Sequence, residues 1–112
     1  MSQITTRTLL PQTSFNQGPV VIGTPIVGPG YYQNMYNLQT FTWALTGVTG
    51  VIRFQGTISE DSNTSDWVDI HSVNAYNKTE NGYVSVRGNF NWIRVHIAGF
   101  VNGTIQNLRV TY

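Results

Sequence analysis

The sequence contains no cysteine. This absence excludes a disulfide framework, a thiolate nucleophile and any zinc or iron–sulfur site built on thiolates. Small secreted domains are often stabilised by disulfides, so the absence also favours synthesis and folding in a cytosol. Residues 1–17 lack the apolar run of a signal peptide, and no stretch approaches the roughly 18 apolar residues of a membrane-spanning helix. We therefore expect no membrane partner.

Charged residues are scarce, at 10% of the chain against about 25% in an average soluble domain. Six Lys and Arg against five Asp and Glu give a net charge of +1, and the six basic residues are scattered along the sequence. A nucleic-acid surface needs a clustered basic stripe that displaces counterions, so we expect no nucleic-acid partner. Low charge also removes the electrostatic repulsion that keeps small proteins apart, which favours association.

Short runs of β-branched and aromatic residues, separated by turn-forming residues, predict strands along most of the chain. Residues 51–59 are typical, because Ile52, Phe54 and Ile58 fall on one face while Arg53 and Gln55 fall on the other. Further strands are predicted at 38–45, 67–73, 83–87, 90–97 and 104–112. Polar loops are predicted at 60–66 and 74–82, and a hairpin turn at Asn102-Gly103.

These strands predict one all-β domain, because 112 residues suffice for a single core. The expected fold is an antiparallel β-sandwich, jelly-roll-like, with about seven or eight strands in two sheets stacked face to face. Residues 1–18 are polar and predict an extended amino-terminal arm or an edge strand, and residues 19–112 form the sandwich domain. Proline cannot donate to a central ladder, so residues 20–22 are expected to form an edge strand followed by an irregular loop.

No group of residues has the spacing of a catalytic site or a cofactor-binding loop, so we expect neither enzymatic activity nor a cofactor. The two histidines, His71 and His96, are predicted to lie on polar outer faces rather than at a metal. Residues 61–65 alternate like the start of a calcium loop. Such a loop needs Gly at its sixth position and Glu at its twelfth, where this chain has Asp66 and Ser72. We therefore predict a solvated loop and no metal site, with a weak cation site in residues 60–66 as the alternative.

Aromatic residues are abundant, at 12% of the chain. Trp92 alternates with Arg94 on the strand face opposite Ile93, and an outward Trp beside an outward Arg is typical of a subunit interface. The alternative interpretation is a platform on which sugar rings stack, as in carbohydrate-binding modules.

Three segments together carry a resemblance to a known group of proteins: Gly30-Tyr31-Tyr32, Ile52-Arg53-Phe54-Gln55-Gly56 and Gly88-Asn89-Phe90-Asn91-Trp92-Ile93-Arg94. Residues 28–112 resemble small virion structural proteins of tailed bacteriophages, notably those that infect cyanobacteria. The resemblance implies a β-sandwich made in the host cytoplasm and placed on the outer surface of the phage particle. It brings no catalytic residues with it.

Within a virion, the expected function is that of a capsid decoration, or cement, protein that binds and stabilises the outer surface of the head. Its partners would be the major capsid protein and further copies of itself, with a trimer favoured. The alternative is a tail or tail-fibre module that binds host-surface carbohydrate.

Six residues are predicted to form the interfaces of such a protein. They are Arg7 and Phe15 on the arm, Tyr31 and Tyr32 after the Pro/Gly-rich loop, and Trp92 and Arg94 on a later strand. The arm (2–17) and the Pro/Gly-rich loop (23–30) are expected to contact the shell or a sister subunit.

Overall fold

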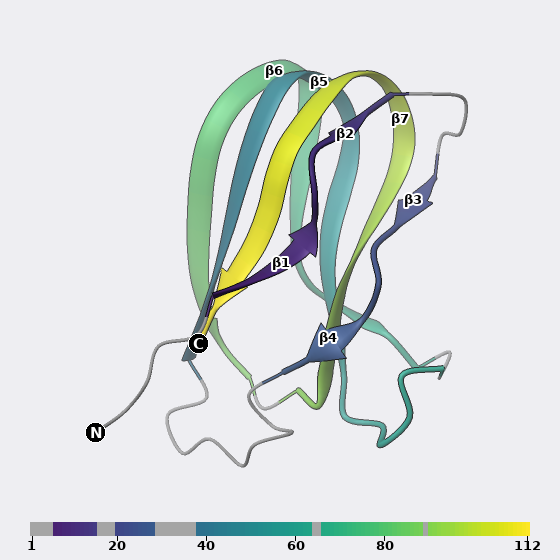
Figure 1. Cartoon of the computed structure of the whole chain (residues 1–112), viewed down its shortest axis with the longest axis vertical. Helices are drawn as coiled ribbons and strands as arrows, with labels where there is room; N and C mark the ends of the chain where they lie inside the picture. The colour runs from purple at the N-terminus through teal and green to yellow at the C-terminus, as the bar shows by residue number, and fades with distance from the viewer. Residues whose placement is uncertain (1–5, 16–19, 29–37, 64–65, 89) are drawn as a thin grey trace.

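Three strands of 20 residues each dominate the fold in the computed structural model, which describes residues 6–15, 20–28, 38–63, 66–88 and 90–112. The strands are β5 (Leu38–Thr57), β6 (Val68–Arg87) and β7 (Trp92–Thr111), and β5 pairs antiparallel with both others. Four short strands pair with the other edge of β7: β1 (Thr6–Leu10), β2 (Thr13–Ser14), β3 (Val21–Ile22) and β4 (Ile26–Val27). The chain therefore forms one antiparallel seven-stranded sheet (Figure 1), which confirms the all-β prediction.

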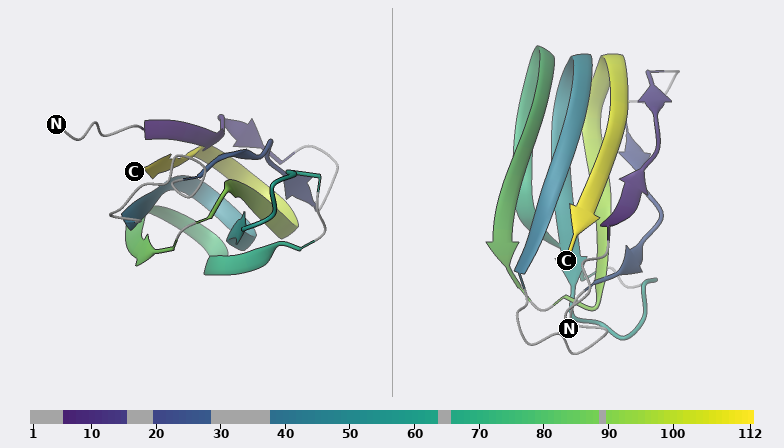
Figure 2. Two further views of the ribbon diagram at one scale, coloured as in Figure 1. Left: turned by 90° about the horizontal axis from the view of Figure 1, so that it is seen from below. Right: turned by 60° about the vertical axis from the view of Figure 1, so that its left-hand side comes forward.

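The sheet is folded back on itself, because each long strand turns over near its middle and returns (Figures 1 and 2). The strand pairing shifts register at the turn, where Val48 lies opposite Lys78 and Thr49 opposite Asn102. Residues with positive φ gather there in all three strands: Gly47 in β5, Asn77 in β6, and Gly99 and Gly103 in β7. Extra residues and left-handed conformations bend a strand without ending its ladder.

The bend separates two halves of the sheet. Half A comprises residues 38–45 of β5, 80–87 of β6 and 104–111 of β7, and half B comprises residues 51–57, 68–75 and 92–98 of the same strands. The strands predicted separately from the sequence are the two halves of these long strands. The loop predicted at 74–82 and the hairpin turn at Asn102-Gly103 were wrong, since both segments lie inside strands. Gly and Asn signal a left-handed residue, which serves a bend within a strand as well as a hairpin turn.

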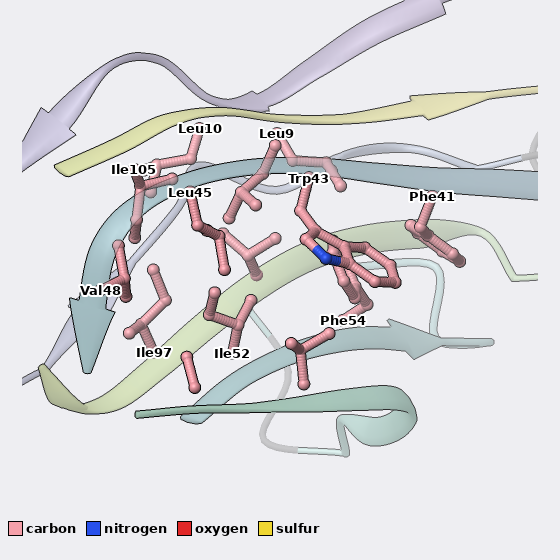
Figure 3. Packing of buried hydrophobic residues seen from close by; sticks show 14 of the residues in the cluster. Leu9, Leu10, Phe41, Trp43, Leu45, Val48, Ile52, Phe54, Ile97 and Ile105 are labelled. Atoms are coloured by element: carbon pink, nitrogen blue, oxygen red, sulfur yellow. The ribbon is translucent and has the colours of Figure 1, made fainter. Parts of the chain in front are cut away.

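The hydrophobic core lies between the two halves (Figure 3). Phe41 of half A and Phe54 of half B are both fully buried, with ring centroids 4.8 Å apart. Trp43 lies 5.9 Å from the Phe54 ring, so this cluster joins the halves. Alternate residues of each strand point into this space, which leaves the residues between them on the two outer faces.

The amino-terminal segment covers one edge of the folded sheet. Its short strands run antiparallel along β7, from the pair Thr6–Thr111 to the pair Val27–Trp92. Leu9 is buried in the core, with 3% of its surface exposed. Residues 6–10 and 13–14 of the predicted arm are therefore edge strands, and Val21–Ile22 is the edge strand that the prolines predict. Residues 1–5 and 16–18 of the arm lie outside the described residues.

Candidate interaction face

The outer face of half B presents polar and aromatic side chains from all three long strands. Arg53 and Gln55 come from β5, Asp69 from β6, and Trp92 and Arg94 from β7. Their neighbours along β5 and β7 fill the core: Ile52, Phe54, Ile93 and Val95 are fully buried. Because side chains alternate along a strand, burial of the apolar set fixes the direction of the polar set.

Gln55 links this outer face across the three strands. Its amide oxygen accepts a hydrogen bond of 2.9 Å from Nε of Arg94, and its amide nitrogen donates one of 2.9 Å to Oδ1 of Asp69. Nε of Arg53 lies 3.7 Å from the other carboxylate oxygen of Asp69. Only 9% of the Gln55 surface is exposed. Its two hydrogen bonds therefore lie beneath the surface and hold the side chains of Arg94 and Asp69 in place.

Two tryptophans cover part of the same face. The guanidinium carbon of Arg94 lies 4.3 Å from the centre of the Trp67 ring, within the range of a cation–π interaction. The Trp92 indole donates a 3.1 Å hydrogen bond to the carbonyl of Glu60, which ties the loop after β5 to β7. Desolvation by burial lowers the pKa of Arg94, but an arginine remains protonated at neutral pH. We call the set Arg53, Gln55, Trp67, Asp69, Trp92 and Arg94 the Trp–Arg face.

Of the four predicted interface residues that the structure describes, Trp92 and Arg94 lie on the Trp–Arg face. Arg7 lies on β1, opposite Val110 of half A. Phe15 packs edge-to-face on Phe100, at 5.7 Å between ring centroids, and its N–H donates to the carbonyl of Gly103 at the bend. Tyr31 and Tyr32 lie outside the described residues. Arg53, Gln55 and Asp69 were missed because their contribution depends on the register between strands, although their outward positions could be read from the alternation.

The histidines lie in different surroundings. His71 stacks on Trp43, with ring centroids 5.8 Å apart, so the outward direction predicted for it was wrong. The cause is a register shift between Phe54 and Gln55, which changes the face of the β6 residues opposite them. His96 is half-buried and lies opposite Arg53 in the ladder.

The acidic loop after β5 is held by its own hydrogen bonds. The Asp61 carboxylate accepts the N–H of Asn63 at 2.9 Å, and the Ser59 hydroxyl accepts the N–H of Asp61 at 3.2 Å. In the part of the chain that the structure describes, no three His, Asp or Glu side chains gather closely enough to hold a metal ion. The same residues include no helix long and apolar enough to cross a membrane.

No protein-family model and no curated protein sequence matches this chain. The resemblance to phage virion proteins therefore stays a prediction, which rests on the segments quoted above.

We expect the hydrogen bonds of Gln55 to stabilise the fold as well as the face. Gln55→Leu removes one hydrogen-bond partner each from Arg94 and Asp69 and should lower the free energy of unfolding by about 1–3 kcal/mol in urea denaturation. Gln106→Leu is the matched control, because Gln106 is exposed and donates one 3.2 Å bond to Thr46; it should change stability by less than about 0.5 kcal/mol. Equal effects of the two substitutions would contradict the central role of Gln55.

Proposed function

We propose that this chain is a structural protein of a phage virion, a decoration protein that binds the outer surface of the head through the Trp–Arg face. The prediction of a jelly-roll-like sandwich with an amino-terminal arm that reaches a neighbour belongs to the same proposal. The observation that carries the proposal is the ordered cluster of two tryptophans and two arginines on one outer face. Tryptophan and arginine are the residues in which the binding energy of protein interfaces concentrates.

The hydrogen bonding of the face favours a protein partner. Both polar atoms of the Gln55 amide are already bonded, and the Asp69 carboxylate faces Gln55 and Arg53. The side chains are therefore held in place before any partner arrives, and such preorganisation lowers the entropic cost of binding. A low overall charge supports permanent packing among many similar subunits.

The second candidate is a tail or tail-fibre module that binds host-surface carbohydrate. Its support is the presence of Trp67 and Trp92 on the same face, since sugar rings stack on indoles. One side of Trp67 already faces the Arg94 guanidinium, which leaves less of that ring for a sugar. The protein-docking function therefore has the stronger support.

Binding of the full chain to phage heads that lack it tests the proposal. Arg94→Ala and Trp92→Ala should each weaken binding by about 30-fold or more, because each removes a central interface side chain. Arg109→Ala is the control, since Arg109 is exposed in half A and lies opposite Thr42 on the other outer face; its binding should stay within about twofold of wild type. Thermal unfolding of each variant confirms that it is folded.

The outcomes separate the two candidates. Failure of the wild-type chain to bind heads, or equal losses for Arg94→Ala and Arg109→Ala, would contradict head binding through the Trp–Arg face. Binding to a glycan array that Trp92→Ala abolishes would favour the tail-fibre module instead.

A further inference from the structure

The outer edge of β6 is a long strand edge that no other described strand covers. Among the described strands the sheet order ends at β6, which pairs with β5 alone (Figure 2). Among its 20 residues only Val73 and Ala75 are buried. Every second residue of an edge strand directs its N–H and C=O away from the sheet, so this edge offers a continuous template for another strand.

The two edges of the sheet differ in the features that prevent a further strand from pairing with them. The edge formed by β1 to β4 consists of strands of two to five residues, with Pro11 after β1 and Pro25 before β4. Short strands and prolines block the addition of a further strand. β6, in contrast, is long and contains no proline. A head-to-tail contact would need the blocked edge of β1 to β4, whereas a twofold contact between β6 of two copies needs only the open edge, and so the twofold contact is favoured.

The bend of β6 restricts its partner. A strand that pairs along both halves of β6 must bend at the same place, near Asn77, and a second copy of this chain has that bend. A twofold axis through the two bends sets half A of one copy beside half B of the other, with the strands antiparallel. Such a pair also covers Ile70, Val84 and Val86 of β6. These side chains pack on the core but are only half-buried in the single chain.

The directions of the β6 side chains support the pairing of half A with half B. In half B the odd-numbered Val73 and Ala75 point inward, whereas in half A the even-numbered Val84 and Val86 do. Opposite residues of an antiparallel pair share a face, so the numbers of two paired residues must add up to an odd value. A register with a sum of 155 also aligns the bends: it places Lys78 opposite Asn77 of the second copy and one residue away from that copy's Lys78. Each Lys78 keeps its ion pair with Glu80, 3.7 Å away. The centre of the pair is thus electrically neutral.

We propose that two copies of this chain pair through β6 to form a twofold dimer with one continuous folded sheet. This inference does not depend on the Trp–Arg face or on the virion role. The twofold pair is an alternative to the trimer that the resemblance favours, and the two can be distinguished by mass.

Sedimentation of the full chain, followed by disulfide trapping, tests the dimer. The wild type should sediment as a dimer, and Arg94→Ala should dimerise equally, which separates this proposal from the function of the Trp–Arg face. Since the chain has no cysteine, single substitutions report one position each. Lys78→Cys should form linked dimers under oxidation, because a disulfide requires Cα atoms within about 7 Å.

Ser85→Cys is the matched control. Ser85 is exposed on β6 in half A. In the proposed pair, half A of each copy lies beside half B of the other copy, so the two Ser85 residues are too far apart for a disulfide. A monomeric or trimeric wild type, efficient linking at Ser85, or no linking at Lys78 would each overturn the proposed pairing.

Discussion

Gly103→Ala should destabilise the protein by about 3–5 kcal/mol, a large part of the 5–15 kcal/mol that is typical of a domain of this size. Gly103 has a φ of +93°, a conformation that costs energy for any residue with a Cβ. A Cβ there would lie 2.3 Å from the carbonyl oxygen of Gly47 and 2.6 Å from Cα of Val48, both backbone atoms of the neighbouring strand. The bends of β5 and β7 would have to move apart, which urea denaturation should detect.

Gly99→Ala is the matched control for this prediction. Gly99 also lies in the bend of β7 with a positive φ of +64°, but no atom lies within 4 Å of the Cβ that alanine would add. Only the conformational cost remains, so the expected loss is about 1–2 kcal/mol. A smaller loss for Gly103→Ala than for Gly99→Ala would contradict the close packing of the bends. Both variants should be compared at one protein concentration, because association would stabilise the folded state.

Phe54→Ala should cost about 3–5 kcal/mol, since it empties the space where the two halves of the sheet meet. Phe54 is fully buried and contacts the Phe41 and Trp43 rings of the facing half. Phe54→Leu keeps most of the volume and should cost about 1.5 kcal/mol or less in the same denaturation experiment.

Phe15→Ala is the control for the core. Phe15 is 39% exposed and makes one edge-to-face contact with Phe100, so its loss should cost only about 1 kcal/mol. If Phe54→Ala and Phe15→Ala had equal effects, the two halves would not share a core through Phe54.

The sequence predicted the strands and their faces better than their connections. Alternation identified the buried Ile52 and Phe54 correctly, because a period of two follows from strand geometry alone. Ile58, which was predicted on the same face, lies beyond the end of β5 and is 77% exposed. The same local rules could not distinguish a hairpin turn from a bend at Gly103, since both need a residue with positive φ. That choice depends on whether the ladder with β5 continues past the glycine, which is a contact between distant segments.

The Trp–Arg face could be predicted only in part for the same reason. Trp92 and Arg94 lie two residues apart on one strand, so their shared direction followed from alternation. Gln55 and Asp69 join them through the registers of β5 with β7 and with β6. The register shift that turns His71 inward has no signature in the local sequence.

Electron cryomicroscopy of particles purified from the phage proposed to carry this gene tests the proposed function most directly. The account predicts repeated density for this chain on the outer surface of the head, with the outer face of half B, including Trp92 and Arg94, against the shell. Absence of the chain from the head, or a position in which that face is turned toward solvent, would contradict it.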